Sequence, residues 1–146
     1  MSKKPSGRHA ARAAALKLLY QLDTQGEFAP RDAYLEEALE MAAPELDLEG
    51  RHFVLRLRLD TSANLERIDE LLTKASKNWR VSRMSRVDRC VLRLAVAELL
   101  GHEPPPPAVL INEAVELAKE YGAESSGKFV HGVLAQVVKL VEQASA

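Results

Sequence analysis

Basic side chains at the start of the chain are the residues best suited to chemistry with another molecule. Residues 1–20 hold five Lys or Arg and no Asp or Glu. Lys3 and Lys4 precede Arg8 and Arg12, which stand one helical turn apart. Charges at this spacing can neutralise successive phosphates, so the pattern fits an RNA contact, and a solvated basic terminus is the alternative interpretation.

A second basic group lies in the middle of the chain. It consists of three arginines at helical spacing and two that precede them: Arg86, Arg89, Arg93, Arg80 and Arg83. Such a stripe is usually solvated or paired with an acidic helix, for which residues 36–40 offer three glutamates. A surface for a partner or for RNA is the alternative interpretation.

No constellation of catalytic or metal-binding residues is visible in the sequence. Cys90 is the only cysteine, and its place in an apolar helical pattern predicts a packed side chain. The four histidines stand on separate segments without metal-ligand spacing: His9, His52, His102 and His131. The isolated glycines match no phosphate-binding loop. We therefore predict that the chain is not an enzyme and has no metal or cofactor.

The composition is that of one compact domain. The chain has 146 residues, of which 47% are hydrophobic and 28% are charged. Its net charge of -1 gives no global reason to expect a polyanion, although the basic segments do so locally. No apolar run approaches the length of a membrane span and no signal-peptide core follows the first charges, which predicts a cytoplasmic protein without membrane contact.

Apolar residues recur at intervals of three and four along the chain, which predicts an all-α fold. We expect helices over 8–24, after Pro30, over 48–76 as one long helix or two with a kink, over 86–100, over 108–121 and from 126 onward. The expected core includes Leu18, Leu57, Ile68, Leu72, Val91, Leu94, Leu117, Val133 and Val137.

Several helix ends carry residues typical of caps. Ser85 is expected to cap the helix that follows it, with Asp88 three residues on. Gly122 is expected to end the preceding helix in a left-handed conformation, and Ser125 or Ser126 to cap the last one.

Two blocks near the end of the chain carry a resemblance to a known family. Residues 111–119 read I-N-E-A-V-E-L-A-K, and residues 128–134 read K-F-V-H-G-V-L. Residues 11–20 and 87–100, the pair Ile68 and Asp69, and Trp79 add to it in the same order. Together they resemble the family of the bacterial transcription antitermination factor NusB over almost the whole chain.

The resemblance implies two packed three-helix bundles with about six to seven helices. Their expected limits are residues 7–76 and 80–142, with residues 1–6 as a flexible basic arm in a single domain. The family pairs with NusE, a ribosomal protein of the small subunit, and the pair binds the single-stranded boxA element of ribosomal RNA transcripts. Other Nus factors and RNA polymerase join this complex, and some members form homodimers.

The resemblance also implies roles for particular residues. The basic motif of the family falls on Arg8 to Arg12, preceded here by Lys3 and Lys4, and its RNA-proximal helix start falls on Lys128 and Phe129. An aromatic side chain there could stack on an unpaired base, and core packing is the alternative for Phe129. The NusE-binding positions match three residues: Asp88, Pro106 and Pro107.

This chain departs from the family pattern at three places. The basic motif reads R-H-A-A-R, which has less charge than the adjacent arginines common in the family. His131 replaces an asparagine, and residues 58–61 read R-L-D-T in place of small residues that permit close helix packing. These departures keep a second hypothesis open, a protein-protein interaction module of the same fold with little RNA binding of its own.

Overall fold

The computed structural model describes residues 7–25, 32–77 and 79–145, and in this part of the chain it is built from helices and turns. The elements are α1 (Gly7–Gln25), α2 (Asp32–Ala42), α3 (Leu48–Ala63), α4 (Leu65–Ala75), the short 3-10 helix η1 (Val81–Arg83), α5 (Arg86–Leu99), α6 (Pro107–Tyr121) and α7 (Ser126–Ser145). The expected all-α fold with six to seven α-helices is confirmed.

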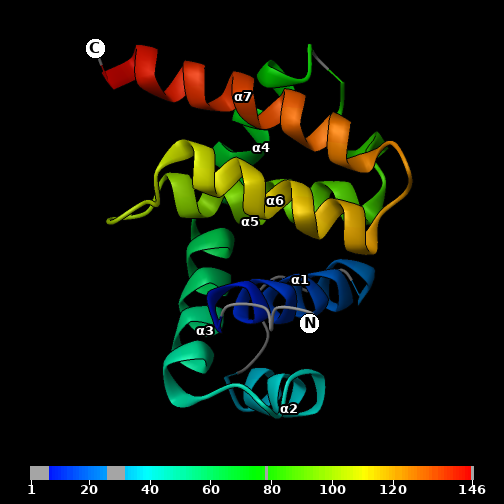
Figure 1. Cartoon of the computed structure of the whole chain (residues 1–146), viewed down its shortest axis with the longest axis vertical. Coiled ribbons are helices and arrows are strands. Elements are labelled where there is room, and N and C mark those ends of the chain that lie inside the picture. The colour runs from blue at the N-terminus through cyan, green and yellow to red at the C-terminus, as the bar shows by residue number, and fades with distance from the viewer. Residues whose placement is uncertain (1–6, 26–31, 78, 146) are drawn as a thin grey trace, which may run out of the picture.

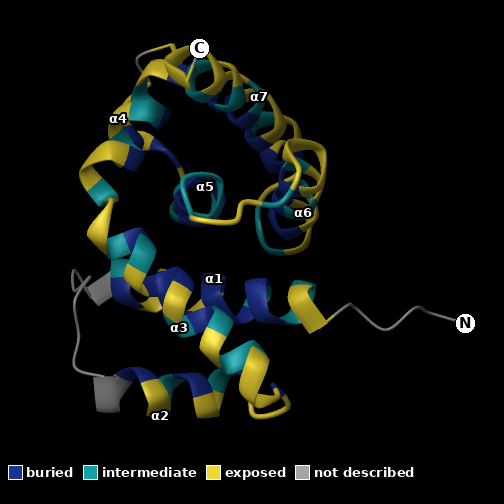
Figure 2. Ribbon diagram, turned by 90° about the vertical axis from the view of Figure 1, so that its left-hand side faces the viewer, coloured by how far each residue is buried: buried dark blue, intermediate teal, exposed yellow. Residues whose placement is uncertain are grey.

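The helices form two groups that share α5 as their common neighbour (Figure 1). Helices α1, α2 and α3 pack together, and α4, α6 and α7 surround α5, which also contacts α1 and α3. Figure 2 shows α5 end-on between the two groups. Helix α4 contacts α5 and α7 and packs with the second group.

The core follows the apolar pattern of the sequence. All nine expected core residues are buried, and α5 is buried continuously from Cys90 to Ala97 because helices cover it on several sides. The buried run is apolar except for Arg93.

The segment predicted as one helix or two is two helices that meet at Asn64. Asn64 is outside the helical conformation, and its side-chain Nδ2 donates to the Asp60 carbonyl at 2.9 Å. Thr61 is fully buried and its hydroxyl donates to the Leu57 carbonyl at 2.7 Å. The polar Thr61 is therefore accommodated inside the fold, since its hydroxyl is satisfied within the helix.

Two expected caps have different outcomes. Ser85 caps α5 as predicted, because its hydroxyl oxygen accepts from the Asp88 amide at 3.1 Å. The left-handed conformation expected for Gly122 is wrong, since its φ of -100° and ψ of -164° are extended. Glycine is needed there for space, because an added Cβ would lie 2.6 Å from the Ser126 hydroxyl and 2.7 Å from the Ala118 carbonyl oxygen.

Candidate nucleic-acid interface

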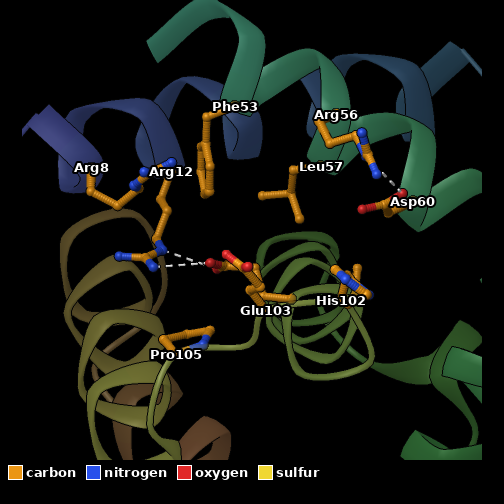
Figure 3. Close-up of a pocket in the computed structure, with 12 residues that line it drawn as sticks. Arg8, Arg12, Phe53, Arg56, Leu57, Asp60, His102, Glu103 and Pro105 are labelled. Atoms are coloured by element: carbon orange, nitrogen blue, oxygen red, sulfur yellow. Dashed lines mark hydrogen bonds and ion pairs between the residues drawn. The ribbon is translucent and has the colours of Figure 1, made fainter. Parts of the chain in front are cut away.

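The basic motif begins α1 and faces a hollow between the two helix groups (Figure 3). This hollow has a volume of about 530 Å³, and α3, α5 and the connection from α5 to α6 supply its other walls. Arg8 and Arg12 both line it, but they differ in how far solvent reaches them. Lys3 and Lys4 lie outside the described residues.

Arg8 is the accessible member of the motif. Its side chain is 46% exposed, and its guanidinium carbon lies 4.2 Å from the centre of the Phe53 ring. Its Nη2 lies 3.7 Å from a carboxylate oxygen of the exposed Glu49, which is a weak surface pair. The aromatic ring orients the arginine while leaving its donors available to a phosphate.

Arg12 is held inside the molecule. Its Nε and Nη2 donate to the two carboxylate oxygens of Glu98 on α5, each at 2.9 Å, and both side chains are about nine-tenths buried. Its Nη1 also lies 3.8 Å from Glu113 on α6. A contact between Arg12 and RNA phosphate would have to compete with this two-pronged ion pair, so we assign Arg12 to joining α1 to α5.

His9 makes a second link between α1 and the C-terminal helices. Its Nδ1 lies 2.8 Å from Glu113 and its Nε2 3.5 Å from Glu120. The hydrogen bond to Glu113 raises the pKa of His9 against the opposing effect of burial, and the charges of both glutamates act in the same direction as that bond. The departure R-H-A-A-R thus brings an imidazole between two carboxylates of α6.

The second predicted RNA position lies at the start of α7, at a different hollow. Lys128 is exposed and Phe129 is partly buried, packing against the core with part of its ring accessible. Both line a groove of about 460 Å³ together with Ser125, which precedes α7, and with residues of the α4–α5 connection and of early α5: Trp79, Arg83, Met84, Ser85 and Asp88. The core packing of Phe129 is therefore partial, and stacking on a base stays a prediction.

The three predicted partner-binding residues do not form one cluster. Asp88 lies in the first turn of α5, and its Oδ1 is buried without a hydrogen-bond partner among the described residues. Pro106 and Pro107 are exposed where α6 begins, beyond the other end of α5. A helix of 14 residues spans about 20 Å, so a protein that touches both sites must extend along α5.

The arginine stripe of α5 is paired, as its simpler interpretation predicted, but with other acids than those of residues 36–40. Asp23 at the end of α1 accepts from Arg86, Arg89 and Arg93, the shortest bond being 2.7 Å from Arg89. Arg93 also makes two bonds of 2.9 Å to Asp69 on α4. Burial opposes the shift, but these arginines hold the pKa of Asp23 below its ordinary value.

The remaining chemical candidates are inert in the described part of the chain. Cys90 is fully buried, and burial raises its pKa to about 12, which removes it as a nucleophile at neutral pH. Among the described residues, no group of three or more His, Cys, Asp or Glu could hold a metal ion. None of their helices is long and apolar enough to cross a membrane.

Sequence reasoning missed two aromatic side chains at these hollows. The spacing of residues gives Phe53 no role, yet its ring centre lies 4.2 Å from the guanidinium carbon of Arg8. Trp79 was used only as a family position, yet it is 54% exposed in the groove that contains Phe129. The available signal was the position of Trp79 in a basic segment, because a tryptophan between lysines and arginines is often a contact residue.

Comparison with known proteins identifies the family to which this fold belongs. Residues 9–139 match the NusB family. The chain belongs to the NusB family. The transcription antitermination protein NusB of Acetivibrio thermocellus is 42% identical over 134 residues, which cover 92% of this chain and 90% of the relative. Membership of this family confirms the prediction that the chain is not an enzyme.

Two solved NusB structures have the same fold. The NusB of T. maritima is 38% identical, with a TM-score of 0.79 and coverage of 94% of this chain and 93% of that one. A complex of the antitermination factors NusB and NusE with double-stranded RNA contains a chain 29% identical, with a TM-score of 0.78 and coverage of 94% and 99%.

Proposed function

We propose that this chain is a cytoplasmic transcription antitermination factor. It pairs with a NusE-type ribosomal protein and binds boxA-like single-stranded RNA in ribosomal RNA transcripts, which promotes processive transcription. The observation that carries this proposal is the match to the NusB family over residues 9–139. The similar NusB in complex with NusE and RNA supports both partners.

The proposed RNA contacts are Arg8, Lys128 and Phe129, with Lys3 and Lys4 ahead of the first helix. Arg8 and Lys128 are exposed cations, and the accessible part of Phe129 is suited to stacking on a base. The pairing of Arg12 with Glu98 supports a positioning role for Arg12 in place of its predicted phosphate contact.

The proposed NusE-type partner contacts Asp88 and extends along α5 towards Pro106 and Pro107. Through this pair the chain joins other Nus factors and RNA polymerase. A homodimer of the free chain is part of the same proposal.

A protein-interaction module with little RNA affinity is the second candidate function. Its support is the state of the basic motif, in which Arg12 is withdrawn and His9 is engaged by Glu113 and Glu120. The three remaining cations of the basic arm, Lys3, Lys4 and Arg8, contribute at a single-strand slope of about 0.7 per contact a fall in affinity of roughly 20-fold between 50 and 200 mM salt.

One mobility-shift experiment separates the two candidates. The chain, the NusE-type protein and their mixture are each titrated against boxA-like RNA and a scrambled RNA of equal length. The proposed function requires the mixture to bind boxA-like RNA more tightly than either protein alone. A stable protein pair that binds both RNAs equally poorly would establish the interaction module instead.

A further inference from the structure

The groove at the start of α7 brings together two segments that are distant in the sequence. The α4–α5 connection and the first turn of α7 lie at the same end of the C-terminal helices (Figure 1). Each segment contributes one aromatic and one basic side chain to the groove: Trp79 and Arg83 from the first, Phe129 and Lys128 from the second. The volume of about 460 Å³ is within the usual range for small-molecule sites, about 300 to 1,000 Å³.

Trp79 is held in the groove by its backbone while its indole stays accessible. Its amide donates to the Ser76 carbonyl at 3.2 Å, and the Ser76 hydroxyl donates to the Trp79 carbonyl at 2.9 Å. Lys77, two residues earlier, has a φ of 57°, a left-handed conformation that costs a non-glycine residue about 1 to 2 kcal/mol. The chain thus adopts an unfavourable turn here and leaves its single tryptophan 54% exposed.

The charge around Trp79 favours a polyanion over an apolar or basic peptide. Residues 74–87 contain five Lys or Arg and no Asp or Glu. Three of these cations, Lys77, Arg80 and Arg83, are exposed and form no ion pair with another described residue. Asp88 is the single acid among the residues that line the groove.

We propose that this groove seats one unpaired nucleobase of the RNA, and that Trp79 is a determinant of RNA affinity. Trp79 and Phe129 supply aromatic surfaces for the base, and Arg83 and Lys128 contact the flanking phosphates. Stacking on an aromatic ring tolerates any base, so this site fixes the position of the strand more than its sequence. The proposal rests on the proposed function, because it requires the chain to bind RNA.

The single tryptophan makes the proposal directly measurable. The complex of the chain with the NusE-type protein is titrated with boxA-like RNA, and the same complex carrying Trp79→Phe provides the background emission. We expect RNA to quench the emission of Trp79. Trp79→Ala should weaken binding about 5- to 150-fold with the salt slope unchanged, and Trp79→Phe should retain most of the affinity.

Matched variants separate stacking from general surface effects. Tyr20→Ala removes another exposed aromatic that does not line the groove and should leave RNA affinity unchanged. Arg83→Gln should lower the salt slope by about 0.7. In a series of RNAs that each lack one base, loss of the base that stacks on Trp79 should weaken binding to the natural chain. The same RNA should bind Trp79→Ala about as well as the complete RNA does, because that variant has already lost the aromatic partner of the base.

Several results would overturn the proposal. RNA that shifts the complex without changing the emission of Trp79, or binds Trp79→Ala with unchanged affinity, would refute the groove while leaving the proposed function intact. If the emission of Trp79 changes when the NusE-type protein is added and does not change further with RNA, the groove binds the NusE-type protein. Failure of the complex to bind any RNA would refute both. Circular dichroism of Trp79→Ala verifies that the fold is retained.

Discussion

Replacing Arg12 with glutamine is expected to destabilise the fold while leaving the ionic part of RNA binding unchanged. Arg12 and Glu98 have side chains 9% and 10% exposed, and two hydrogen bonds of 2.9 Å join them. Removing one partner of such a pair leaves the other charge buried, which typically costs about 3 to 5 kcal/mol. The loss should fall at this upper level because Glu113, 3.8 Å from Arg12, also loses a neighbouring cation.

Urea unfolding followed by circular dichroism measures this loss as a lower midpoint with an unchanged slope. The double variant Arg12→Gln with Glu98→Gln should cost less than the sum of the single variants, by about 0.5 to 3 kcal/mol, because neither charge is then left unpaired. The matched control is Arg8→Gln, whose partner is exposed and 3.7 Å distant, with an expected cost below about 1 kcal/mol.

The RNA measurement gives the decisive contrast. Arg8→Gln should lower the salt slope of RNA binding by about 0.7, and Arg12→Gln should leave that slope unchanged at temperatures where it is folded. An Arg12→Gln variant that unfolds at the urea concentration of the natural chain, and loses as much salt slope as Arg8→Gln, would show that Arg12 contacts phosphate.

Three further predictions concern other titratable groups. Because the pKa of His9 is raised in the fold, its contribution to stability is complete below the unfolded pKa of about 6.5 and is lost as pH rises through the folded pKa. Urea unfolding of the natural chain and of His9→Gln from pH 5.5 to 8.5 should show this difference, and parallel stability profiles would contradict it. Asp23→Asn should lower the free energy of unfolding by about 3 to 5 kcal/mol at pH 7, because three arginines lose a buried carboxylate. Since the pKa of Asp23 is lowered in the fold, this stability is present above the unfolded pKa of about 3.9 and is lost as pH falls through the folded pKa. An unfolding midpoint equal to that of the natural chain at pH 7 would refute this prediction. Cys90, with a pKa of about 12 and no exposure, should react with thiol reagents at pH 8 only after unfolding, and rapid labelling in native buffer would disprove its burial.

The apolar pattern of the sequence was sufficient to predict the helices and their buried faces. Helical periodicity depends on residues within one or two turns, so Leu94 and Val133 could be assigned to the core without knowledge of their neighbours. The same local reasoning fails where tertiary contacts decide. Glycine is needed at position 122 because Ser126 and the Ala118 carbonyl leave no room for a side chain, and neither contact is visible in the spacing of residues.

The sequence was sufficient to predict which residue types form the candidate site, but it predicted the roles of those residues only in part. A basic stripe indicates that anions lie nearby, but it does not state whether they are carboxylates of the same chain or phosphates of another molecule. For Arg89 and Arg93 the anion is Asp23, more than 60 residues earlier in the sequence. The identity of a partner at this separation depends on how the helices cross, which periodicity does not contain.

Arg8 and Arg12 show how one helical turn separates two roles. Residues four apart share a helix face, so both arginines point towards the hollow between the helix groups. Arg8 stands in the first turn of α1, where Phe53 supports it and solvent still reaches the guanidinium. Arg12, one turn further in, meets Glu98 of the central helix, and burial makes an unpaired charge costly there. The distance of each arginine along α1 from α5 therefore decides which one remains available to RNA. The spacing of the two arginines in the sequence does not reveal that distance.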